Sequence, residues 1–307
     1  MEQEKKVILL AGPTASGKSK LALKLAEYFD GEIINADSMQ IYKEISILTS
    51  KPNSEDIKII KHHLYGFNSV KKNFSTGSWL KLVIKKIQNQ WKNGKTPIIV
   101  GGTGLYFKAL TDGLVKIPDI PNNFRTRIRK LHKLIGQKKF FTHLIKLDPL
   151  AKKFVLPTDK QRSMRAYEVK KFTKKSLFEF KKKTKPKFNR NVFNKLFINI
   201  PKELLHKQIE KRVEKMFDDG VIAEVKQFYK IKVNQELPSR KIIGINEIKD
   251  YLQGKKSLIE TKELIALKTR QYAKRQFTWA RGHMKDWKMI YSSNINDLFK
   301  KTINKIS

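Results

Sequence analysis

The sequence predicts an α/β protein, in which a doubly wound parallel sheet surrounds a phosphate-binding loop (P-loop) and a basic helical insertion interrupts this core. Three observations predict this fold. A G-x-x-x-x-G-K-[ST] motif lies between an apolar run and a helical pattern. Strand and helix patterns alternate after it. Positive charge is concentrated in one segment without strand patterns. We expect core segments at 1–120 and 191–307 and the insertion at 121–190.

The first predicted element is a short strand at residues 7–11, VILLA, which is apolar throughout, as in strands buried on both faces of a sheet. The loop GPTASGKS follows, and the next apolar residues recur at helical spacing. Backbone N–H groups in such a loop point at phosphate oxygens, Lys18 reaches the outer phosphate, and the Ser19 hydroxyl suits Mg²⁺. The predicted phosphate site consists of Gly12, Pro13, Thr14, Ala15, Ser16, Gly17, Lys18 and Ser19.

Two further strands are predicted before the insertion. The stretch EIINADS reads as a strand ending at Ser38, and PIIV at 97–100 breaks into glycines just before Thr103. Ligands of doubly wound sheets bind beyond the carboxyl ends of the strands. We therefore expect Lys18, Asp37 and Thr103 to meet in one crevice.

The predicted insertion carries half of the excess positive charge. Residues 121–190 contain 23 Lys and Arg against 4 Asp and Glu, whereas the whole chain has a net charge of +38. A general lysine bias would not concentrate charge in this way, so we expect a polyanionic partner. Within this segment, Thr158 to Gln161 reads as a capping box that starts a helix.

The core pattern resumes after the insertion. KLFINI at 195–200 reads as a strand, and the helix predicted over 202–219 has one apolar face, formed by Leu205, Ile209, Val213 and Met216. The last predicted helical segment, 267–283, mixes basic and aromatic residues.

Composition excludes several classes of protein. There are no cysteines, which excludes disulfides and thiolate zinc sites. No apolar run is long enough to span a bilayer, and the N-terminal residues do not resemble a signal peptide, so we expect a cytoplasmic protein with no membrane partner. The adjacent His62 and His63 lack further candidate ligands and are predicted to be packing or surface residues.

The residues alone leave the reaction open. An NTP-hydrolysing motor normally has a strand ending in a metal-binding Asp, whereas PIIV ends in glycines, which weakens that alternative. A small-molecule kinase remains possible with Asp37 as its catalytic acid. Asp37 could equally be a cap or loop residue, although the polar groups that follow it in DSMQIY suit a planar polar ligand such as a nucleobase.

Six motifs resemble one known family in order and spacing: GPTASGKS, NADSMQIY, KHHLYG, PIIVGGTGLYFKAL, PTDKQRSMRAYEV and TRQYAKRQFTWAR. They are similar to those of tRNA dimethylallyltransferases, also called tRNA isopentenyltransferases. The resemblance implies a prenyltransferase of tRNA modification. Such an enzyme transfers the dimethylallyl group of dimethylallyl diphosphate to N6 of adenosine 37 beside the anticodon, with Mg²⁺ and release of diphosphate. It also implies an insertion that grips the tRNA anticodon arm, and we expect a monomer.

The resemblance assigns roles residue by residue. Asp37 stands at the position of the family's general base, and Thr103 stands at the position of a residue near the reacting centre. The P-loop is expected to hold the diphosphate. The positions matching tRNA contacts are Asp37, Ser38, Met39, Gln40, Thr103, Arg125, Gln161, Arg162, Ser163, Met164 and Arg165. One departure is Leu48, which stands where the family reads Gly and puts the conformation of its loop in doubt. Two alternatives stay open: an adenylate isopentenyltransferase, against which the charge of the insertion counts, and a P-loop kinase or RNA-binding NTPase.

Overall fold

The computed structural model describes residues 5–182, 184–292 and 294–306. The chain divides into two compact units, one formed by residues up to 111 together with those from 188 onward, the other by 112–187. The second unit is continuous in sequence and interrupts the first. This second unit begins at residue 112 rather than at the predicted residue 121, because it includes the extended stretch that precedes its first helix.

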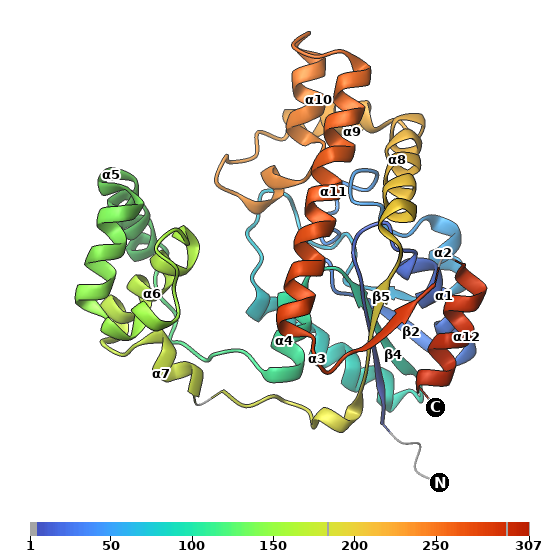
Figure 1. Cartoon of the computed structure of the whole chain (residues 1–307), viewed down its shortest axis with the longest axis horizontal. Coiled ribbons are helices and arrows are strands. Elements are labelled where there is room, and N and C mark those ends of the chain that lie inside the picture. The colour runs from blue at the N-terminus through green and yellow to red at the C-terminus, as the bar shows by residue number, and fades with distance from the viewer. Residues whose placement is uncertain (1–4, 183, 293, 307) are drawn as a thin grey trace. The chain divides into compact units, whose positions relative to one another are not determined.

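The first unit is built on a six-stranded parallel sheet with the order β3-β2-β4-β1-β5-β6 (Figure 1). Strand β1 pairs with β4 on one side and with β5 on the other. This arrangement confirms the predicted α/β fold. The strands are β1 (Val7–Ala11), β2 (Gly31–Asn35), β3 (His62–His63), β4 (Thr96–Gly101), β5 (Phe193–Asn199) and β6 (Lys288–Tyr291).

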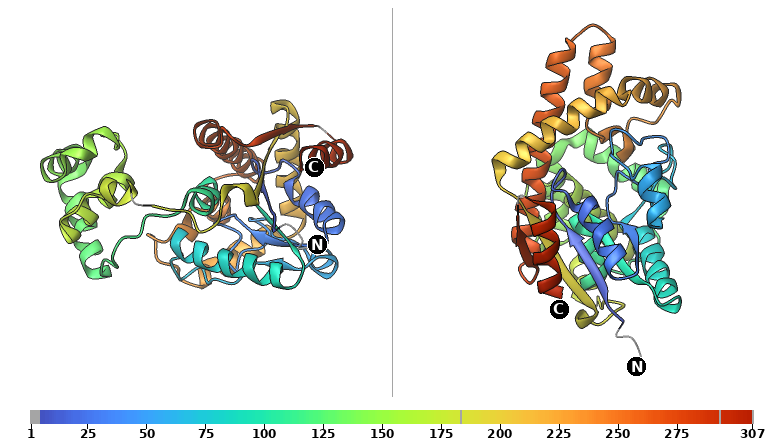
Figure 2. Two further views of the ribbon diagram at one scale, coloured as in Figure 1. Left: turned by 90° about the horizontal axis from the view of Figure 1, so that it is seen from below. Right: turned by 90° about the vertical axis from the view of Figure 1, so that its right-hand side faces the viewer.

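Helices cover both faces of this sheet, and successive residues of β1 point to opposite faces. Ile8 and Leu10 join the core cluster that includes α1, α8 and α12, whereas Val7 and Leu9 join the cluster of α3 and α4. Helix α12 lies beside α1 (Figure 2). The helices of this unit are α1 (Lys18–Tyr28), α2 (Ser54–Ile59), α3 (Thr76–Lys92), α4 (Gly104–Asp112), α8 (Lys202–Asp218), α9 (Val221–Lys230), α10 (Ile245–Leu252), α11 (Leu258–His283) and α12 (Ile295–Ile306), with 3₁₀ turns η2 (Arg190–Val192) and η3 (Pro238–Lys241).

Two details of the sheet differ from the sequence-based prediction. The prediction that the second strand extends to Ser38 is wrong: β2 ends at Asn35, whose side chain accepts the Asp37 N–H at 2.7 Å and turns the chain. The short edge strands β3 and β6 were not predicted. In β3, His63 Nε2 lies 2.6 Å from Glu32 Oε2, so this histidine packs onto the neighbouring strand, as expected for a packing residue.

The second unit has a small core of its own. Its helices are α5 (Asn122–Leu147), α6 (Lys160–Thr173) and α7 (Leu177–Lys182), with the 3₁₀ turn η1 (Pro149–Lys153). The buried side chains of Leu144, Ala151, Val155, Ala166 and Phe178 form that core. The predicted capping box is wrong by one residue, because Asp159 caps α6 by accepting the Arg162 N–H at 2.9 Å. None of the helices within the described ranges of either unit is both long and apolar enough to cross a membrane.

We expect Gly101→Ala to destabilise the first unit strongly. A Cβ at Gly101 would lie 2.2 Å from the carbonyl carbon and oxygen of Ala36, which are backbone atoms of the neighbouring segment and cannot turn away. Overpacking of this kind costs about 1–3 kcal/mol. Thermal unfolding followed by circular dichroism measures the effect.

Gly282 offers the matched control. Its position is helical, and a Cβ there meets nothing within 4 Å. Because alanine is favoured over glycine in helices by up to about 1 kcal/mol, Gly282→Ala should leave the unfolding midpoint unchanged or raise it. Equal midpoints for the two variants would contradict the close approach at Gly101.

Candidate active site

The P-loop connects β1 to α1 and forms one end of a cavity of about 430 Å³. Gly17 has a φ of +81°, which glycine adopts without strain and which starts α1 without a side-chain cap. The Ser16 hydroxyl is buried and makes no hydrogen bond with any described residue. An open helix N-terminus and an unpaired buried hydroxyl are suited to an anionic ligand.

The N–H of Thr14 is an exception to the expectation that the loop N–H groups face a ligand. It donates to Gln276 Oε1 at 2.9 Å. The Thr14 hydroxyl does face the cavity and accepts a hydrogen bond from Arg212 Nη1 at 2.6 Å.

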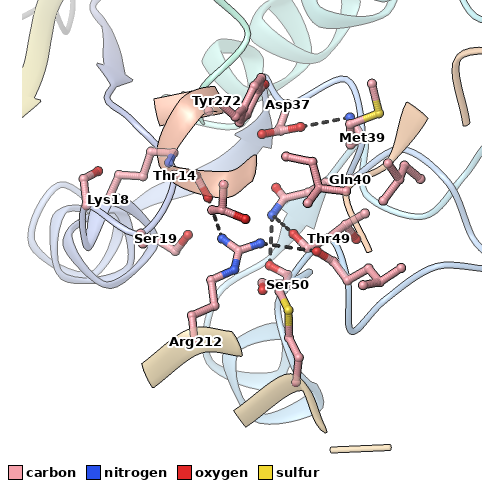
Figure 3. A pocket seen from close by; sticks show the side chains of 18 of the residues that line it. Thr14, Lys18, Ser19, Asp37, Met39, Gln40, Thr49, Ser50, Arg212 and Tyr272 are labelled. Atoms are coloured by element: carbon pink, nitrogen blue, oxygen red, sulfur yellow. Dashed lines mark hydrogen bonds between the residues drawn. The ribbon is translucent and has the colours of Figure 1, made fainter. Parts of the chain in front are cut away.

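Arg212 is a cavity residue that the sequence analysis missed. It extends from α8 and also donates to the carbonyl of Leu48 at 3.3 Å (Figure 3). Its signal in the sequence is its place on the apolar face of the helix, between Ile209 and Met216. An arginine on a buried face usually has a specific partner.

Two cations thus converge on the P-loop. Lys18 donates to the carbonyl of Pro13 at 2.8 Å. Burial lowers the pKa of Lys18 to about 8; nearby Asp37 opposes this shift, whereas Arg212 adds to it. A bound anion would relieve the repulsion between the two cations, so this end of the cavity favours a polyanionic ligand.

Asp37 lines the same cavity from the turn after β2, beside Tyr272 (Figure 3). Its Oδ1 accepts the Met39 N–H at 2.9 Å. The turn is held by Asn35, fully buried and also missed by the sequence analysis, which donates to the Asp37 carbonyl at 3.0 Å and to the Leu64 carbonyl at 2.9 Å. A buried asparagine directly after an apolar strand is the signal that could have identified it.

The charge of Asp37 acts on three tyrosines. Burial raises the pKa of the Tyr65, Tyr106 and Tyr272 hydroxyls, and the negative charge of Asp37 raises each pKa further. These hydroxyls therefore stay neutral and polar at physiological pH.

A second cavity of about 330 Å³ adjoins the first and shares Met39, Tyr272 and Arg275 with it. Ser38 and Thr103 line it. The Thr103 hydroxyl accepts the Ser38 N–H at 2.9 Å and donates to the Ser38 hydroxyl at 3.2 Å. Lys18 and Asp37 therefore line one cavity, whereas Thr103 lines the adjacent one, so the three residues do not share a single crevice as predicted.

The loop after Gln40 closes the first cavity, and side chains fix its backbone. The Gln40 amide, expected to face a nucleobase, instead donates to the carbonyls of Thr49 and Ser50, both at 2.9 Å. Glu224 accepts N–H groups from three loop residues, with Oε2 3.0 Å from the N of Leu48. In this loop the left-handed backbone conformation is adopted by Ser50, with a φ of +49°, and not by Leu48. Leu48 in place of the family's glycine therefore causes no backbone strain.

The remaining predicted residues belong to the second unit. Arg162 is exposed and pairs with Asp159 at 3.3 Å, and Arg165 pairs with Glu168 at 3.4 Å. Ser163 is buried and accepts from Gln137 Nε2 at 3.1 Å, so it supports the helix rather than facing outward. Arg125 also lies in this unit, as do the exposed Gln161 and half-buried Met164.

Across the described ranges, no three His, Cys, Asp or Glu side chains are grouped so that they could hold an ion. Mg²⁺ commonly takes one or two protein oxygens together with substrate phosphates and water. Ser19 lines the cavity and supplies such an oxygen, so the donor set suits Mg²⁺ carried with a phosphate ligand.

We expect the affinity of this cavity for inorganic diphosphate to fall as the pH rises above 8. The ligand binds cationic Lys18, and because the pKa of that amine is lowered to about 8, the free protein loses this charge above that pH. The dissociation constant should rise by up to about tenfold per pH unit. Calorimetric titrations between pH 7 and 10, with Lys18→Met as reference, measure the dependence. Identical profiles for the two proteins would contradict it.

Comparisons with known proteins agree with this geometry. The family model described as IPP transferase matches residues 40–283. The chain is 50% identical over 301 residues to the tRNA dimethylallyltransferase of Pelagibacter ubique, covering 98% of this chain and 96% of the relative. It is 42% identical over 304 residues to the enzyme of that name from Rickettsia bellii strain OSU 85-389, covering 98% and 95%.

Solved structures give the same result. A tRNA isopentenylpyrophosphate transferase from Staphylococcus epidermidis aligns with a TM-score of 0.68 and 29% identity, over 98% of this chain and 99% of that one. A eukaryotic dimethylallyltransferase, described as acting on tRNA, aligns with a TM-score of 0.81 and 28% identity, over 95% of this chain and 75% of that one. The sheet, the loop and these matches together place the chain in the tRNA dimethylallyltransferase (IPP transferase) family.

Proposed function

We propose that this protein transfers the dimethylallyl group from dimethylallyl diphosphate to N6 of adenosine 37, beside the tRNA anticodon. The observation that carries the proposal is the pair of adjacent cavities. Lys18 and Arg212 line the first cavity beside the P-loop. Asp37 lines the same cavity, and its neighbour Ser38 lines the second cavity. The first cavity suits the donor, and the second suits the adenine.

The proposed reaction forms a bond between adenine N6 and the terminal allylic carbon while the bond from that carbon to oxygen breaks. Diphosphate leaves with the electron pair, and Lys18, Arg212 and the loop N–H groups stabilise its developing charge. The N6 proton passes to the Asp37 carboxylate. This base matters because the amine lone pair is delocalised into the ring, and such catalysis contributes typically about 10²- to 10⁴-fold.

Mg²⁺ is part of the proposal. Ser19, together with diphosphate oxygens and water, would hold the ion, which neutralises charge on the leaving group. The apolar residues of the first cavity, among them Met39, Leu48 and Ile265, would exclude water from the allylic group. We expect the protein to act as a cytoplasmic monomer.

A transfer assay tests the function. The protein is incubated with Mg²⁺, labelled dimethylallyl diphosphate and a tRNA transcript that carries adenosine at position 37, and the digested RNA is examined for labelled N6-dimethylallyladenosine. A transcript with guanosine at that position is the control. Phosphate release from ATP without any labelled nucleoside would favour a P-loop kinase or NTPase instead. Transfer to free adenylate but not to tRNA would favour an adenylate isopentenyltransferase.

We expect the second unit to supply most of the tRNA affinity and its salt dependence. The ion pair of Arg162 with Asp159 is an exposed helix-surface pair worth little in water, so Arg162 remains available to phosphates. Arg165 is half-exposed and pairs with the buried Glu168, so it can offer to a phosphate only the part of its guanidinium that faces away from that carboxylate. For loop RNA, log K falls with log[salt] by roughly 0.7 per phosphate neutralised. The double variant Arg162→Ala, Arg165→Ala should weaken tRNA binding, flatten this slope by up to about 1.4, and leave donor affinity unchanged.

Titrations of tRNA at several salt concentrations measure both quantities. The control removes the same charge from exposed positions of α9 in the first unit, with Lys226→Ala and Lys230→Ala. We expect the control to change the slope by less than the double arginine variant does. A double variant with the slope and affinity of the parent protein would contradict the proposed role of the second unit.

A further inference from the structure

Gln276 joins three segments that are far apart in the sequence. It lies in α11 with only 9% of its surface exposed. Its Oε1 accepts the Thr14 N–H at 2.9 Å, and its Nε2 donates to the Gly102 carbonyl at 3.0 Å. One amide therefore links the P-loop to the end of β4, through a backbone group of each.

Each partner belongs to a different cavity. Thr14 lines the first cavity, where the phosphate end lies, and its hydroxyl is held by Arg212. Gly102 lines the second cavity and precedes Thr103, whose N–H donates to the Ala36 carbonyl at 3.1 Å. The amide of Gln276 thus fixes the P-loop relative to the strand end that borders the second cavity.

Local chemistry makes this contact specific for glutamine. A Cβ at Gly102 would lie 2.2 Å from Nε2, so the approach requires glycine at that position. Glutamate at position 276 could accept from Thr14 but would place a carboxylate against the Gly102 carbonyl. Methionine would match the length of the side chain and provide neither hydrogen bond.

We infer that Gln276 is a positioning residue that holds the donor-binding loop at the correct distance from the acceptor cavity. This inference rests on the proposed function. Group transfer requires the reacting atoms to lie about 3–3.5 Å apart and in line, and a displacement of about 1 Å can cost 10²-fold in rate. Gln276 itself lines the second cavity, but each polar atom of its amide is engaged with the backbone, so we assign its effect to the positions of Thr14 and Gly102.

The test compares Gln276→Met with the parent protein in three measurements. We expect single-turnover transfer at saturating donor and tRNA to slow by roughly 10- to 100-fold. Dissociation constants for dimethylallyl diphosphate without tRNA, and for tRNA without donor, should change by less than the rate does. Thermal unfolding shows whether the variant is folded. Gln276→Glu should also slow transfer and in addition weaken donor binding, because it adds negative charge beside the P-loop.

Gln271→Met is the matched control, since Gln271 is an exposed residue of the same helix; its transfer rate should equal that of the parent. A Gln276→Met variant that transfers at the parent rate would overturn the inference, as would a rate loss accompanied by an equal loss of donor affinity. Failure of the proposed function is distinguishable, because in that case the parent protein itself would produce no dimethylallylated tRNA.

Discussion

Asp37→Asn is expected to lower kcat by about 10² or more, because an amide cannot accept the proton that leaves the adenine amine. The substitution preserves the local geometry. Asparagine keeps an oxygen for the Met39 N–H, and the turn itself is held by the buried Asn35. We therefore expect the dissociation constant for tRNA to stay near the parent value. Single-turnover transfer of labelled dimethylallyl groups to saturating tRNA measures the rate.

The control is Asp219→Asn, which makes the same chemical change at an exposed position at the end of α8. Its kcat should equal that of the parent. If Asp37→Asn also retained the parent turnover, Asp37 would not be the base, and the proton would have to leave by another group.

Lys18→Ala should reduce kcat/KM by about 10³, because it removes a cation that faces both the bound diphosphate and the charge that develops on it. Donor affinity without tRNA should weaken by roughly 10- to 100-fold, the usual range for a hydrogen bond to a charged group. Calorimetric titration with dimethylallyl diphosphate and steady-state kinetics measure the two effects separately.

Lys85→Ala is the control for this variant, since Lys85 is an exposed lysine of α3. Its kinetics should match those of the parent. Lys18→Ala with parent kinetics would show that the diphosphate binds elsewhere. A loss confined to donor binding would show that Lys18 does not act on the leaving group.

Local sequence predicted those parts of the site that depend on local geometry. The spacing of the P-loop specifies a strand, a turn and a helix start, so the position of Lys18 followed from the motif alone. The glycines after PIIV likewise placed Thr103 at a strand end. These features need only the residues on either side of them.

The side chains that were missed act across long sequence distances. Arg212, Glu224 and Gln276 bond to backbone groups of residues 14–102, and nothing near them in the sequence identifies those partners. The strand β3 was missed because it has two residues and pairs only with β2. A two-residue edge strand is too short to show an alternation of apolar and polar residues, and it forms because the neighbouring strand is there to pair with it.

The interruption of the first unit by the second affects the order in which the chain can fold. During synthesis, β4 becomes available to β1 first, whereas the other partner of β1, β5, lies beyond the whole of residues 112–187. At about 5–20 residues per second, the ribosome needs roughly 4–15 s to cover that distance. Throughout that interval Val7–Ala11, an apolar strand, has an open edge that could pair with another nascent chain. Because the helices of the second unit have their own core, they can fold meanwhile, so the vulnerable step in producing this enzyme is the late arrival of β5.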